Sequence, residues 1–194
     1  MKRIALIALI LTAPLAAQSW ELGVFAGQQS YKSNDILSVN SEVKSKTVLG
    51  ARLGYSIVDL GPALLQVTAG FQPKTDSEID VAGMNTGKKY QHQHTSVGVM
   101  FNFKAMVAFG AGVEYRMEKL NATNSGISDV SYSRPWLRAN IGYAFPSPVV
   151  KPFLGLEVAL PLTSKSFDLN GSREDGYRSF APKLQIGIYG GIRF

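Results

Sequence analysis

Strict alternation of apolar residues with polar or small ones is the feature that most constrains this chain. In the segment VAFGAGVEYRMEK, residues 107–119, Phe109 and Val113 share one parity while Glu114 and Arg116 share the other. Residues two apart lie on the same face of a β-strand. The eight segments that carry this alternation are 18–31, 46–58, 63–75, 92–103, 106–119, 132–145, 151–162 and 181–194. Beyond the N-terminal segment no window keeps helical spacing over helical length, so the sequence predicts an all-β protein.

The connections between these segments alternate in length. Short turns fall around DLGP (59–62), KA (104–105) and PSPVV (146–150), whereas the other connections are long and rich in Ser, Asn, Asp, Gly and Lys. The long loops are 32–45, 76–91, 120–131 and 163–180. This pattern is typical of a transmembrane barrel, with short periplasmic turns and longer extracellular loops.

One face of every segment is apolar and the other is polar or small. Leu53, Val99 and Ile186 represent the apolar face, which a soluble barrel would turn toward its interior. The chain offers no second sheet or helix to cover eight such faces, so lipid must cover them. An open sheet edge cannot be hydrated inside a bilayer. The sequence therefore predicts an eight-stranded antiparallel up-and-down transmembrane β-barrel over residues 18–194.

The N-terminal segment has the form of a secretory signal peptide. In MKRIALIALILTAPLAA, residues 1–17, Lys2 and Arg3 precede a short apolar run that ends in small residues. We expect export and cleavage near Ala17. The chain has no cysteine, which excludes disulfides, a thiolate metal site and a cysteine nucleophile. The net charge is +6, but the lysines and arginines are spread among acidic residues and do not cluster, so nucleic-acid binding is not expected.

Aromatic residues mark the strand ends that adjoin the short turns and the termini. This expected periplasmic girdle consists of Trp20, Tyr55, Phe103, Tyr143, Phe145 and Phe194. On the opposite side Phe71 and Tyr115 suit an outer girdle. Trp136 has the wrong parity for it unless Pro135 sits in a bulge.

With the terminal GIYGGIRF, the signal peptide and eight strands, the whole chain resembles the small OmpA/OmpX-type outer-membrane barrels. The resemblance implies a monomer in the outer membrane of a Gram-negative-type bacterium, surrounded by lipid and lipopolysaccharide. Ile188, Ile192 and Phe194 resemble the C-terminal signal read by the barrel-assembly machinery, which would then be a partner. Gly190 occupies a position where that signal usually has a bulky residue.

Charged residues of lumenal parity stand at similar heights in their strands. They are Arg52, Glu114, Arg116, Arg138 and Glu157. An eight-stranded barrel is only wide enough for side chains to fill it, and an unpaired buried charge costs several kcal/mol. The sequence therefore predicts a lumenal ion-pair network that fills the barrel. A gated ion path through the same residues is the alternative.

Three motifs allow site chemistry besides the lumenal charges. His92 and His94 share a face and would bind a metal if Asp76, Glu78 or Asp80 supplied a third ligand. His94 and Ser96 resemble the H-x-S pair of lipid A deacylase barrels, but Ser96 has lumenal parity and no Glu follows in the same strand.

The third motif, DLNGSREDG (168–176), has the spacing of a calcium-binding loop, but Arg173 stands at the position where such a loop requires glycine. A hairpin tip is expected there, with Arg173 and Arg178 as candidate donors to phosphates. No metal, cofactor or catalytic residue is expected in the chain as a whole. The expected role is structural or surface interaction through the four extracellular loops. A narrow channel for small or hydrophobic solutes and a lipid A-modifying enzyme are the alternatives.

Overall fold

The computed structural model describes residues 20–31, 34–36, 39–81, 84–123, 129–147, 150–163, 165 and 181–194. The expected signal peptide, 1–17, and the motif 168–176 lie outside these residues. The strands within the described ranges are β1 (Trp20–Tyr31), β2 (Asn34–Ile36), β3 (Val39–Val43), β4 (Lys46–Leu60), β5 (Ala63–Val81), β6 (Met84–Lys104), β7 (Val107–Thr123), β8 (Val130–Ala144), β9 (Lys151–Pro161) and β10 (Pro182–Arg193). No helix in this part of the chain is long and apolar enough to cross a membrane.

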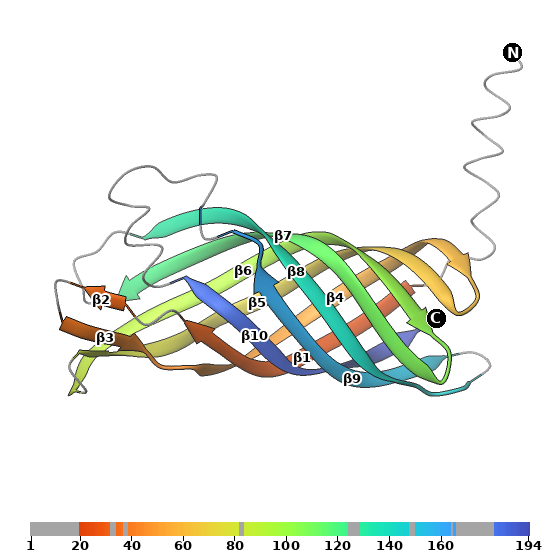
Figure 1. The fold of residues 1–194 in the computed structure, drawn as a ribbon, viewed down its shortest axis with the longest axis horizontal. Coiled ribbons are helices and arrows are strands. Elements are labelled where there is room, and N and C mark those ends of the chain that lie inside the picture. Colours follow the sequence, from red (N-terminus) through yellow and green to blue (C-terminus); the bar gives the residue numbers. More distant parts are fainter. Residues whose placement is uncertain are drawn as a thin grey trace, which may run out of the picture.

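Eight of these strands form a closed ring. The order is β5-β4-β1-β10-β9-β8-β7-β6, and the pairing of β5 with β6 closes it. Every pairing in the ring is antiparallel. Figure 1 shows the strands tilted around a common axis, with β2 and β3 at one end and the C-terminus at the other. The expectation of an all-β, eight-stranded antiparallel barrel is confirmed.

The side chains alternate between the inside and the outside of the ring. Along β1 Trp20, Leu22 and Val24 are exposed, while Glu21 and Phe25 are buried. This alternation continues around the barrel. The apolar residues Leu53, Val99, Val113 and Ile186 are 43%, 42%, 51% and 49% exposed, whereas the buried set is rich in Glu, Arg, Gln and His. The interior is polar and the outer wall is apolar.

The prediction that residues 76–91 form a polar loop is wrong. There β5 and β6 continue as a hairpin, with Asp76 opposite Gln91 and Glu78 opposite Lys89. The amide of Gln91 donates to Asp76 Oδ1 over 2.9 Å, and this cross-strand bond supports the pairing. Near the ring the inward side chains of Ser77 and Tyr90 are still buried, whereas Glu78 and residues 84–87 are exposed. The alternation that marks a half-buried strand is therefore lost toward the tip, although the backbone stays extended.

The predicted loop 32–45 also contains strands. β2 pairs with β3, and β3 pairs with the end of β5 through Ser41 opposite Val81 and Val43 opposite Ile79. Beside them Lys44 makes an ion pair of 2.9 Å with Asp80. Together β3, residues 76–81 of β5 and residues 84–91 of β6 form a sheet beyond the ring's apolar wall, which we call the projecting sheet.

No bulge occurs at Pro135. The register of β7 with β8 runs without a shift through Pro135, which faces Tyr115, and Trp136, which faces Glu114. Trp136 is therefore lumenal and fully buried. The outer girdle lacks it, because the parity of β8 is regular along its whole length.

Candidate functional site

The lumen contains three layers of polar contacts, and the central one joins opposite walls. Arg52 of β4 donates from Nη1 and Nη2 to the two carboxylate oxygens of Glu157 of β9, each over 2.7 Å. Such a two-pronged contact is the strongest geometry for a guanidinium and a carboxylate. This contact connects β4 to β9 across the interior of the ring.

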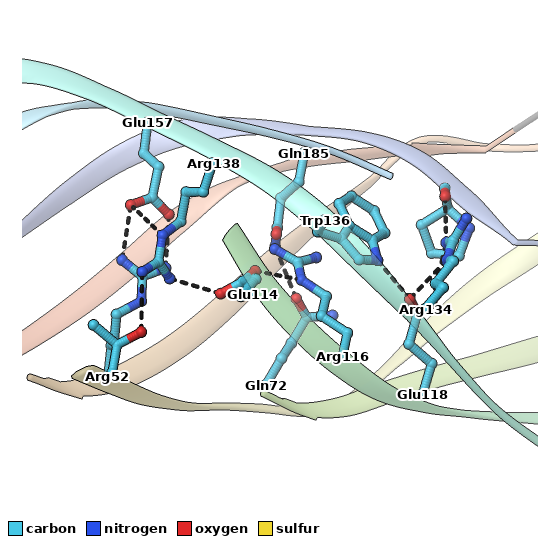
Figure 2. A network of polar contacts seen from close by, with 12 residues as sticks. Arg52, Gln72, Glu114, Arg116, Glu118, Arg134, Trp136, Arg138, Glu157 and Gln185 are labelled. Atoms are coloured by element: carbon cyan, nitrogen blue, oxygen red, sulfur yellow. Dashed lines mark hydrogen bonds and ion pairs between the residues drawn. The ribbon is translucent and has the colours of Figure 1, made fainter. Parts of the chain in front are cut away.

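Glu114 of β7 is held between two arginines in the same layer. Arg116 Nε donates to its Oε1 over 2.6 Å, and Arg138 Nη1 donates to its Oε2 over 2.7 Å. Arg138 Nε also lies 3.9 Å from Glu157 Oε2, which links this cluster to the Arg52 pair. The structure thus brings Arg52, Glu114, Arg116, Arg138 and Glu157 into one network (Figure 2).

The second layer lies toward the projecting sheet and centres on Glu118. This carboxylate accepts hydrogen bonds from Tyr132 Oη (2.7 Å), Arg134 Nε (2.9 Å) and Trp136 Nε1 (2.8 Å). His92 Nε2 lies 3.1 Å from it, and His92 Nδ1 lies 3.0 Å from the amide nitrogen of Gln29. Since the amide donates to Nδ1, the ring hydrogen sits on Nε2 and points at the carboxylate.

Arg134 and Trp136 were not among the residues expected in the network. Their signal was present in the sequence, because 134, 136 and 138 share one parity and Arg138 was assigned to the lumen. The guanidinium of Arg116 stacks over the Trp136 ring at 3.9 Å, which joins the second layer to the first (Figure 2). A tryptophan there fills space that small side chains would leave to water.

The third layer lies toward the short turns. Glu21 of β1 accepts a hydrogen bond from Tyr189 Oη over 2.8 Å and pairs with the ammonium of Lys104. The amide of Gln66 is 3.4 Å from the same carboxylate. Lys104 also sits over the ring of Phe153 at 3.9 Å. This layer too was missed, although Glu21 has the parity opposite to Trp20 and Leu22.

A small, partly open cavity lies between β4, β5 and the lumenal side chains. Its volume is about 20 Å³, and it borders His94, Ser96 and Arg116. It is large enough for about one water molecule. His94 Nδ1 and Arg116 Nη1 are buried without a hydrogen-bond partner among the described residues.

The histidine motif serves the lumenal network. His92 is held by Glu118 and Gln29, and no group of three side chains suited to a metal occurs among the residues described. Ser96 is buried in the lumen, as its parity indicated, and His94 has no carboxylate hydrogen-bonded to it in the described part of the chain. The orienting acid that hydroxyl activation requires is therefore not in place.

Ile188 and Ile192 of the expected assembly signal lie on the outer face of β10, and Phe194 directly follows this strand. Ile188, Ile192 and Phe194 are exposed, with Gly190 between them on the same face. The backbone of Phe194 exchanges two hydrogen bonds with Trp20, N to O over 2.9 Å and O from N over 2.7 Å. The signal is thus also the place where the ring closes.

A closed ring with an apolar wall and an ion-paired interior defines a small transmembrane β-barrel. Solved structures of outer-membrane proteins have the same fold. A major outer membrane protein of Thermus thermophilus is 14% identical, with 92% of this chain and 98% of that chain covered and a TM-score of 0.59. OprG from Pseudomonas aeruginosa is 12% identical, with 91% and 95% covered and a TM-score of 0.53.

At these identities the likeness concerns the fold. No family model and no curated protein matches the chain. The resemblance to the small outer-membrane barrels, inferred from strand number, turn lengths and parity, is confirmed at the level of architecture. This chain has the fold of the small eight-stranded outer-membrane barrels.

Proposed function

We propose that this chain is a monomeric outer-membrane protein of a Gram-negative-type bacterium that acts through its extracellular surface, with the lumen as a structural filling. The shared fold supports the location, and the apolar wall fits a lipid environment that includes lipopolysaccharide in the outer leaflet. Ile188, Ile192 and Phe194 would be the contact for the barrel-assembly machinery during insertion. We propose no catalytic role.

The observation that carries this proposal is the mutual pairing of the lumenal charges. Arg52 is paired with Glu157, and Glu114 with Arg116 and Arg138, so the buried charges are largely neutralised by each other. A solute crossing the barrel would have to break these pairs. A buried charge that loses its partner in a low-dielectric interior costs several kcal/mol.

The surface role is supported by the projecting sheet. Its residues lie beyond the apolar wall and carry exposed groups of both charges, such as Glu78, Lys89 and the paired Lys44. Met84 next to the hairpin tip is 72% exposed. Ordered, solvent-facing structure with polar and apolar side chains is where a barrel of this kind presents contacts.

Planar-bilayer recording tests the filled lumen. The wild-type protein is expected to give no steady conductance. The double variant Arg52→Ala/Glu157→Ala removes a pair without leaving either charge alone and is expected to conduct. Lys44→Ala/Asp80→Ala removes an ion pair that lies outside the lumen and serves as the control. Steady conductance of the wild-type protein, lost in Glu114→Gln, would instead support the narrow channel.

Attachment of cells tests the surface role. Replacing residues 78–89 by a two-residue Asn-Gly turn shortens the projecting hairpin and leaves the ring intact. We expect several-fold lower attachment of cells to polystyrene coated with serum protein, at equal surface levels of the two proteins. Equal attachment by shortened, wild-type and protein-free cells would leave only a structural role. Identical lipid A masses with and without the protein are expected, which tests the enzyme alternative.

A further inference from the structure

A cavity of about 360 Å³ opens at the end of the barrel that carries the short turns. Three connections surround it: Gly61 and Pro62 between β4 and β5, Ala105 and Met106 between β6 and β7, and the start of the β8–β9 connection at Phe145. It adjoins the third lumenal layer, with which it shares Lys104 and Phe153, and it opens toward the periplasmic side of the proposed membrane protein.

The charged side chains that line this cavity are all cationic. They are Lys104, Lys151 and Arg193, and no aspartate or glutamate among the described residues lines it. Glu21, just inside, pairs with Lys104 and is also engaged by Tyr189. One carboxylate therefore faces three cations, which leaves an excess of positive charge at this mouth.

Two of the cations stand directly opposite each other. Lys151 and Arg193 are register partners on β9 and β10. Like charges at directly opposed positions destabilise a sheet. Neither makes an ion pair with any residue that the structure describes, and Nη1 of the 6%-exposed Arg193 has no hydrogen-bond partner there. A buried guanidinium nitrogen without an acceptor is costly, and a bound anion would remove that cost.

The side chains that line the cavity indicate which kind of anion it would bind. A guanidinium with two ammonium groups nearby suits an oxyanion with several acceptor oxygens, above all phosphate. Phe153, Phe145 and Met106 give the same cavity an apolar wall. Phe145 and Tyr143 belong to the periplasmic girdle, which places the cavity at the height of the headgroups in the adjoining leaflet.

We propose that Lys104, Lys151 and Arg193 form a phosphate-binding site at the periplasmic mouth. The phosphate comes either from solution or from the headgroup of a phospholipid in the periplasmic leaflet. Its charge offsets the repulsion between Lys151 and Arg193, so binding holds the ends of β9, β10 and β6 together.

The test uses the full barrel purified in an uncharged sugar detergent. Inorganic phosphate is titrated at constant ionic strength by calorimetry, and dihexanoyl phosphatidylglycerol is titrated separately against dihexanoylglycerol, which lacks the phosphate. A ligand that binds only the native state stabilises it by RT ln(1 + [L]/Kd) and raises the unfolding temperature, which gives a second readout. The variants are Arg193→Gln and Lys151→Gln. Lys183→Gln, an exposed change at the other end of β10, is the matched control.

Saturable binding of one or both phosphates is expected, weakened at least tenfold in Arg193→Gln and less than twofold in Lys183→Gln. Binding of inorganic phosphate assigns the soluble source, and binding of phosphatidylglycerol alone assigns the lipid. If Arg193→Gln fails to fold, the exposed Lys151→Gln variant decides, with a several-fold loss expected. No binding of either phosphate, or equal binding to wild type and both site variants, would overturn the proposal.

Discussion

At the scale of single residues, Glu118 is the acceptor on which the second lumenal layer depends. Glu118→Ala would remove the carboxylate paired with the buried Arg134 and the acceptor of the Tyr132 hydroxyl and the Trp136 indole N–H. Removing one partner of a buried pair costs about 3–5 kcal/mol. We expect a loss of that size in the free energy of unfolding, measured by guanidinium titration of the protein in detergent.

The matched control for Glu118 is Glu78→Ala. Glu78 is exposed and accepts a hydrogen bond from Asn85 over 2.8 Å on the projecting sheet. A surface substitution of this kind changes stability by roughly 0.5 kcal/mol or less. Equal losses in the two variants would mean that burial does not set the strength of the Glu118 contacts.

Gly23 is the residue that lets Tyr189 reach Glu21. A Cβ at Gly23 would meet the Tyr189 ring, whose hydroxyl donates to Glu21 over 2.8 Å. Gly23→Ala is therefore expected to cost about 1–3 kcal/mol through overpacking. Tyr189→Phe, which deletes the hydrogen bond and keeps the ring, should cost about 1 kcal/mol.

The control for this site is Gly54→Ala, since the nearest atom to a Cβ there is Glu21 Cβ at 3.4 Å, an ordinary contact. Thermal unfolding of the three variants in one detergent gives the comparison. If Gly54→Ala destabilised the barrel as much as Gly23→Ala, the ring of Tyr189 would not be the cause.

The contact of Arg138 with Glu114 and Glu157 on consecutive strands could be predicted from the sequence, but the pairing of Arg52 with Glu157 could not. Parity assigned Arg52 and Glu157 to the interior, but they are 105 positions apart and meet across the lumen. Such contacts depend on the stagger of the strands, which is a property of the closed ring. Arg134 and Trp136 were accessible to the parity argument, and only the allowance for a bulge at Pro135 hid them.

At the scale of strands, β10 combines closure of the ring with the expected assembly signal. Phe194→Ala should lower the amount of folded protein in the outer membrane several-fold, because the machinery that inserts barrels would read this residue. The heat-modifiable shift in gel mobility of membrane fractions measures it.

The control for Phe194→Ala is Phe145→Ala. Phe145 is an exposed aromatic residue at the same end of the barrel, and it is 46% exposed where Phe194 is 56% exposed. Both variants should fold equally well into synthetic vesicles without the machinery. A similar deficit of both in cells would reduce Phe194 to an ordinary girdle residue.

The predicted and the observed strands differ mainly at their ends. Within the apolar wall the predicted segments match β4, β7, β8 and β9 closely, because a face toward lipid enforces alternation. Toward the tip of the projecting sheet the same backbone geometry continues without alternation, because Glu78 and residues 84–87 are all exposed. β3 and the far part of β5 were therefore invisible to a search for period-two hydrophobicity.

At the scale of the whole molecule, the apolar wall should tolerate charge only near its rims. Leu156 lies at the middle of β9 and is 59% exposed, and Leu162 is 54% exposed just past its end. Arginine facing lipid costs about 2–4 kcal/mol at the bilayer midplane and about 0–1 near the interfaces.

Leu156→Arg is thus expected to destabilise the barrel in phospholipid vesicles by several times more than Leu162→Arg. Reversible guanidinium unfolding of both variants gives the two free energies. In sugar-detergent micelles, which deform around a charge, the difference should shrink. A larger loss for Leu162→Arg would mean that the apolar wall is not centred on the bilayer.

The ring is sealed between β1 and β10, with Trp20 bonded to Phe194. One edge of β1 therefore has no partner until β10 has been synthesised and delivered. Until then its unpaired backbone N–H and C=O groups form a sheet edge with which another chain could pair, and the ring is complete only when β10 joins it.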